Sequence, residues 1–203
     1  MKSLSEIETT AKRASKAAGY SWGVSEEAGK SIRFLELFSL PGIKHIHEFF
    51  NEKSKSNFEK LHLINEKNSS SNNPYCPIIL GVSFLDQINV LENLQKIEFK
   101  NVAYPIIFIS FISRSSEIVG KKIYVKIDEK KILLNLNVNI NSNFIDQEFP
   151  KIANTIEVIL LENEDNFTDD EWNNLYKLSE ETFVEESDSL KEGAAGAGLT
   201  DND

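Results

Sequence analysis

The chain has 203 residues, of which 40% are hydrophobic and 27% are charged, so it falls in the ordinary range of globular proteins. Its formal net charge of −10 argues against general binding to nucleic acid or to an anionic membrane. A single cysteine excludes an internal disulfide framework. No apolar run approaches the roughly 20 residues of a membrane-spanning helix. The first residues are polar and lack a signal-peptide core, so we expect a cytoplasmic protein.

The N-terminal region has the pattern of two antiparallel helices. Ser3 can cap the first helix, with Glu6 at capping-box spacing. Apolar residues then recur every three or four positions up to Gly19, which is a natural helix end. The second helix is expected to begin between residues 21 and 25 and to end before Pro41. The short connection favours a helical hairpin.

The following region is predicted to change from helices to strands. Residues 43–50 suggest a third helix and residues 58–64 a short fourth one. The polar run 65–74 is predicted to be a loop. The apolar run 78–82 fits either a buried strand or the start of a helix that reaches Leu91, because periodicity does not separate these alternatives.

The strongest strand candidate is Tyr104–Ile112, which is mostly apolar and is followed by polar residues. The pair 122–127 and 132–136 is separated by a charged turn and predicts a β-hairpin. Further strands are predicted over residues 94–99 and 156–161.

The last predicted helix runs from about Asp169 to Glu185. Thr168 fits as its cap, and Glu171 completes a capping box. Together these elements predict an α+β fold: an N-terminal helical hairpin and short helices, then a mainly antiparallel sheet, a C-terminal helix and a Gly/Ala-rich tail. We describe it as one domain over residues 1–203. Its parts are a helical part (1–64), a loop (65–77), a sheet-rich part with the last helix (78–186) and a tail (187–203).

The hairpin connection carries the strongest candidate for a binding site. Glu26 and Lys30 are four residues apart on a helix, and the ordinary interpretation is a solvated ion pair. Trp22, however, lies beside acids and a base, where it could stack on a planar ligand. The predicted ligand-binding residues of this stretch are Tyr20, Ser21, Trp22, Glu26, Glu27, Lys30 and Arg33. Of these, Glu26, Glu27 and Lys30 are candidates for a catalytic role.

The tail is a second unusual segment. Its Gly193, Gly196 and Gly198 follow a helix instead of a strand, so a dinucleotide fingerprint is excluded by context. The tail fits either a frayed terminus or a segment docked in a groove. If docked, the residues that would close a pocket are Thr200, Asp201, Asn202 and Asp203.

Metal and thiol chemistry have little support in the sequence. His45 and His47 point to different sides of a helix, and His62 is alone. Cys76 follows a loop but has no patterned base beside it, so a core or loop role is favoured. We therefore expect no metal site and no cofactor.

Three segments together resemble a known family. They are SLSEIE (residues 3–8), GYSWGVSEEAGK (residues 19–30) and GAGLTDND (residues 196–203). In these segments the chain resembles a bacterial family of unknown function that occurs in alphaproteobacteria. Both ends match, which implies that the tail is part of the domain. The resemblance implies no activity, substrate or catalytic residue.

The leading functional hypothesis is a cytoplasmic protein that binds a small polar or anionic metabolite between the hairpin and the tail, with an enzymatic role left open. The alternative is a non-catalytic accessory or regulatory subunit whose acidic tail docks into a partner protein. A third hypothesis, self-association into a homo-oligomer, would place the apolar segment 108–112 at a subunit interface as a strand.

Overall fold

The computed structural model describes residues 2–135, 139–142, 148–162 and 164–182. The chain forms two compact units, Met1–Asn163 and Glu164–Asp203, and each is described by itself. The described residues of the first unit form a six-stranded sheet and five helices, and those of the second form one helix. The α+β class predicted from the sequence is confirmed.

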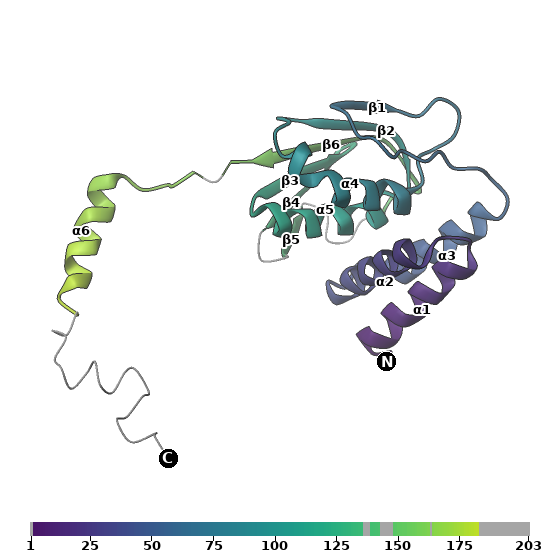
Figure 1. Cartoon of the computed structure of the whole chain (residues 1–203), viewed down its shortest axis with the longest axis horizontal. Coiled ribbons are helices and arrows are strands. Elements are labelled where there is room, and N and C mark those ends of the chain that lie inside the picture. Colours follow the sequence, from purple (N-terminus) through teal and green to yellow (C-terminus); the bar gives the residue numbers. More distant parts are fainter. Residues whose placement is uncertain (1, 136–138, 143–147, 163, 183–203) are drawn as a thin grey trace, which may run out of the picture. The chain divides into compact units, whose positions relative to one another are not determined.

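The sheet has the strand order β1-β2-β6-β3-β4-β5 (Figure 1). Among the described strands, β1 and β2 pair in parallel and the other neighbouring pairs are antiparallel, as predicted for most of the sheet. The strands are β1 (Lys67–Ser69), β2 (Ile97–Ala103), β3 (Lys122–Ile127), β4 (Lys130–Asn135), β5 (Asn139–Ser142) and β6 (Ile152–Leu161).

Two helices act as crossovers between parallel strands. α4 (Pro77–Leu91) connects β1 to β2, and α5 (Pro105–Val119) connects β2 to β3 across the inserted β6. Because both crossovers advance in the same direction across the sheet, a common handedness places both helices on the same face. α4 and α5 lie together against that face in Figure 1.

The remaining helices of this unit form a further layer. They are α1 (Leu4–Ala17), α2 (Trp22–Leu37) and α3 (Gly42–Lys53). α2 and α3 pack on α5, so α5 lies between the sheet and the N-terminal helices (Figure 1). This position explains why 11 of the 15 residues of α5 are buried.

The α1–α2 hairpin has the termini predicted from the sequence. Ser3 caps α1 by accepting a hydrogen bond from the N–H of Glu6, and Ser21 caps α2. Gly19 ends the first helix with φ +97°. The two backbones come close at Gly29, where an added Cβ would lie 2.8 Å from the carbonyl oxygen of Glu8.

Three predictions for individual segments are wrong. Tyr104–Ile112 is not a strand but the beginning of the buried helix α5, so self-association through a strand at 108–112 has no basis. Residues 58–64 form no helix, and the predicted loop 65–74 contains the short strand β1. The open alternative at 78–82 is decided in favour of a helix, α4.

The described part of the second unit is the helix α6 (Asp169–Glu180). Thr168 and Glu171 form the predicted capping box, with both reciprocal hydrogen bonds present. α6 ends at Glu180, before the predicted end near Glu185, and the tail lies outside the described residues. Among the described residues, no helix is long and apolar enough to cross a membrane.

Candidate functional site

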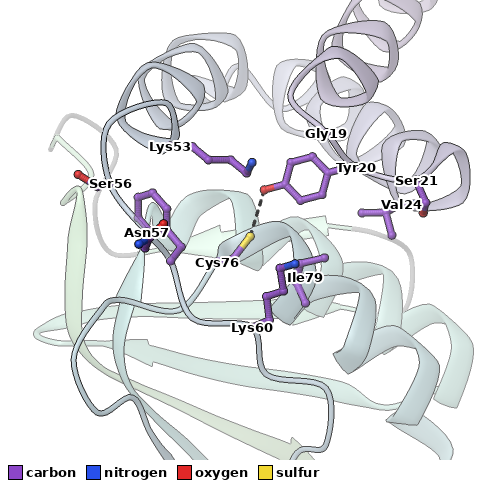
Figure 2. Close-up of a pocket in the computed structure, with 11 residues that line it drawn as sticks. Gly19, Tyr20, Ser21, Val24, Lys53, Ser56, Asn57, Lys60, Cys76 and Ile79 are labelled. Carbon is purple, nitrogen blue, oxygen red and sulfur yellow. Dashed lines mark hydrogen bonds between the residues drawn. The ribbon is translucent and has the colours of Figure 1, made fainter.

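A cavity of about 370 Å³ lies where three segments of the first unit meet (Figure 2). The α1–α2 turn forms one wall, the end of α3 with the chain that follows it forms the second, and the start of α4 forms the third. The lining residues are Gly19, Tyr20, Ser21, Val24, Lys53, Ser56, Asn57, Phe58, Lys60, Cys76 and Ile79.

Tyr20 connects the hairpin turn to the start of α4. Its side chain is buried, and its hydroxyl lies 3.2 Å from Sγ of Cys76 (Figure 2). The ring also faces Lys53, whose Nζ is 5.1 Å from the ring centroid. Lys53 donates a hydrogen bond of 2.9 Å to the carbonyl oxygen of Ala18, so it also satisfies the C-terminal end of α1.

The Tyr20–Cys76 pair is uncharged at neutral pH. Burial raises the pKa of the Tyr20 hydroxyl, and the neighbouring Cys76 raises it further. Burial also raises the pKa of the Cys76 thiol, by more than the hydrogen bonds from Tyr20 and from backbone N–H groups lower it. A thiol in this state is a poor nucleophile, because the thiolate is the reactive form.

Glu59 holds the second and third walls together, although it does not line the cavity. Its carboxylate accepts hydrogen bonds from the backbone N–H groups of Ser71, Asn72 and Asn73, at 2.8–3.2 Å. These bonds lower the pKa of Glu59 to about 2. The backbone carbonyl of Glu59 also accepts the N–H of Cys76 at 2.8 Å. The neighbouring residue, Lys60, lines the cavity together with Ile79 at the start of α4.

The electrostatics of the cavity are positive. Two of its lining residues are the lysines Lys53 and Lys60, and none is a carboxylate. Lys60 has no ion-pair partner among the residues that the structure describes. The capping residues of two helices, Ser21 of α2 and Cys76 of α4, also line it. Helix N-termini carry partial positive charge, so all four features favour an anion.

The predicted charged residues of α2 lie outside this lining and form ion pairs within α2 and with neighbouring helices. Glu26 pairs with Lys12 of α1 at 3.2 Å and with Lys30 at 3.5 Å. Arg33 pairs with Glu8 of α1 at 3.0 Å. The pairs with Lys12 and Glu8 join α1 to α2, whereas the pair of Glu26 with Lys30 lies within α2.

Glu27 belongs to the same network and reaches the core helix. It pairs with Lys30 at 2.8 Å and with Arg114 of α5 at 2.6 Å. Burial raises the pKa of Glu27, but the hydrogen bonds from Lys30 and Arg114 outweigh it and leave the pKa below its ordinary value. Glu27 is therefore an ionised bridge between α2 and α5. A catalytic role for Glu26, Glu27 and Lys30 stays a prediction.

The remaining predicted site residues divide into three groups. Tyr20 and Ser21 line the cavity. Trp22 does not; it is 57% exposed, and Nζ of Lys16 lies 5.4 Å from its ring centroid. Thr200, Asp201, Asn202 and Asp203 lie outside the described residues, so their expected closure over the hairpin stays a prediction.

Sequence reasoning missed most of the cavity. Lys53, Asn57 and Lys60 carry no motif, and Cys76 was assigned to the core or a loop. Charge composition does not point to them either, because residues 1–163 carry nearly equal numbers of acidic and basic side chains. No group of three or more metal-binding side chains is found among the described residues.

The comparison with protein families identifies the N-terminal part of the chain. Residues 2–75 match the family described as "Protein of unknown function (DUF3726)". The resemblance to a family of unknown function is confirmed. The match contains the segments at residues 3–8 and 19–30 and nine of the 11 lining residues of the cavity. The segment at residues 196–203 lies outside it. No curated protein and no solved structure matches the chain.

Proposed function

We propose that the protein binds a small anionic metabolite in the cavity between the hairpin turn, the end of α3 and the start of α4. The observation that carries this proposal is the charge of the lining: two lysines and two helix N-termini, with no carboxylate. The volume of about 370 Å³ is at the lower end of ligand pockets.

The lining also suggests how the ligand is oriented. In the proposed complex, Lys60 binds a carboxylate or phosphate group of the ligand. The amide of Asn57 and the hydroxyl of Ser56 supply further hydrogen bonds. Phe58 and Ile79 offer apolar surface for the rest of the ligand. A binding role is favoured over catalysis, because the lining has no histidine or carboxylate to act as a base and its thiol is protonated.

Native mass spectrometry of the full chain purified from its own cells is the first test, and we expect a bound mass that is lost on denaturation. A thermal-shift panel of inorganic phosphate, short dicarboxylates and phosphorylated three-carbon compounds then identifies the class. Binding stabilises a protein by mass action, so the ligand class raises Tm with concentration.

Lys60→Ala tests the geometry, and Lys55→Ala is the matched control, because Lys55 is an exposed lysine of the same segment that does not line the cavity. A charge-assisted hydrogen bond is worth about 1.5–3 kcal/mol, so we expect Lys60→Ala to weaken binding by about 10- to 100-fold. The control should bind like the unmodified protein. If no anion of the panel raises Tm, or if both variants bind equally well, the proposal is wrong.

A further inference from the structure

The net negative charge of this chain lies in its second unit. Residues 164–203 carry 13 acidic and two basic side chains, whereas residues 1–163 carry 19 acidic and 20 basic ones. The first unit is therefore close to neutral, and the whole negative charge of the protein belongs to the segment that contains α6. A charge imbalance of this size over 40 residues creates a strong local field.

α6 is stabilised by contacts among the residues at its own N-terminus. Besides the capping box, Phe167 precedes the cap and its ring stacks on Trp172, with 5.6 Å between the ring centroids. A contact between these two positions is a hydrophobic staple. Asp169, Asp170 and Glu171 in the first turn complement the helix dipole. A helix of 12 residues is marginal in water without such devices, so α6 is preorganised.

The same helix presents an apolar stripe. Trp172, Leu175 and Tyr176 are spaced by three and four residues, and Leu178 extends their side of the helix. Within the described residues of the second unit, all four side chains are exposed and no residue of α6 is buried. Asn173, Lys177 and Glu180 lie on a different side. An ordered helix with large exposed apolar side chains in a strongly acidic segment is typical of a recognition helix.

We propose that α6 is a docking helix for a partner protein whose apolar groove is bordered by lysine and arginine side chains. Trp172, Leu175 and Tyr176 would fill the groove, and the surrounding carboxylates would face its basic border. A membrane surface is a poorer match, because helices that lie on anionic lipid carry Lys and Arg on their polar face. The charge likewise disfavours nucleic acid.

Site-specific photo-cross-linking in the full chain tests this proposal. A benzophenone amino acid replaces Leu175 in one variant and Asn173 in a matched control, and cross-links are formed in the protein's own cells and mapped by peptide sequencing. We expect the Leu175 variant to cross-link one other protein at a peptide in which apolar residues are flanked by Lys or Arg. The Asn173 variant should give little of that product.

Reconstitution with the purified cross-linked partner then measures the contribution of each group. We expect Trp172→Ala to weaken the complex at least tenfold, Asn173→Ala to change its Kd by less than twofold, and 500 mM NaCl to weaken it several-fold relative to 50 mM. Circular dichroism verifies that each variant keeps its helix content. Anion binding in the cavity should be unchanged by Trp172→Ala, so this test is independent of the proposed function.

Three outcomes would overturn the proposal. Cross-links from position 175 that map to the same chain would mean that α6 docks within the protein. Cross-links to a second copy, together with a dimer by light scattering, would mean that it mediates self-association. Equal products from positions 175 and 173 would mean that the contact does not depend on the apolar stripe.

Discussion

α5 and α6 are helices of similar length that exist for different reasons. α5 has 15 residues, of which 11 are buried, and its cap residue Tyr104 adopts a left-handed conformation with φ 43° and makes no side-chain capping bond. α6 has 12 residues, none buried, and it begins with a complete capping box and a hydrophobic staple. Burial therefore stabilises α5, whereas short-range bonds stabilise α6. α5 is therefore part of the core of the first unit, whereas α6 is the helix that we propose to bind a partner.

Truncating one aromatic side chain in α5 and one in α6 should give the largest difference in the free energy of unfolding. Phe108 of α5 is fully buried and lies 5.3 and 5.6 Å, by ring centroids, from Phe99 and Phe84. We expect Phe108→Ala to lower the free energy of unfolding by about 3–5 kcal/mol. Trp172→Ala in α6 should cost less than about 1 kcal/mol, because Trp172 is largely exposed. Urea denaturation of the full-length variants measures both, and equal losses would contradict the comparison.

Alanine substitutions at two separate glycines test the close packing of α5, with a smaller expected change in stability. A Cβ on Gly81 of α4 would lie 2.2 Å from a ring carbon of Phe111 of α5, whereas a Cβ on Gly23 of α2 would meet nothing within 4 Å. Forcing extra volume into a packed core costs about 1–3 kcal/mol. We expect Gly81→Ala to destabilise by about that amount in thermal denaturation.

The control substitution, at Gly23, should not lower the stability. Gly23 lies in a helix, where alanine is favoured over glycine by about 1 kcal/mol, so Gly23→Ala should be neutral or stabilising. A loss of Tm in both variants would show that the effect is not packing against α5.

Replacing Glu59 should have the smallest effect on stability. Its carboxylate accepts hydrogen bonds from nearby backbone N–H groups, as the capping residue of α6 does. Its pKa of about 2 is below the value of about 4.3 for an unfolded chain, so its contribution to stability is complete above about pH 5. This contribution is lost as the pH falls toward 2. We expect Glu59→Gln to lower Tm modestly at pH 7 and the two proteins to converge near pH 2. A difference in Tm that is independent of pH would contradict this.

The predictions from the sequence succeeded where local chemistry is sufficient. The capping residues Ser3 and Thr168, the helix end at Gly19 and the β-hairpin of β3 and β4 all depend on bonds between residues close in sequence. The prediction of a strand over Tyr104–Ile112 is wrong because a helix that is buried on all sides shows no apolar period in its sequence. Likewise, the segment 58–64 has a helix-like spacing of apolar residues, but the backbone of Glu59 bonds to Pro74 and Cys76 instead.

The candidate site follows the same division. The sequence drew attention to the turn at residues 19–31, and two of its residues, Tyr20 and Ser21, do line the cavity. The other walls come from the segments around Lys60 and Cys76, which no spacing rule relates to that turn.

By itself, therefore, the sequence determined the helix caps, the hairpins, the α+β class and the concentration of acidic residues after position 163. Only the tertiary structure decided that the apolar run of α5 is a helix and that a lysine-lined cavity forms beside Tyr20. The physical reason is the separation of the interacting residues along the chain. Capping bonds and charge counts involve residues that are close in sequence. Burial and cavity lining, in contrast, depend on which distant segments pack together.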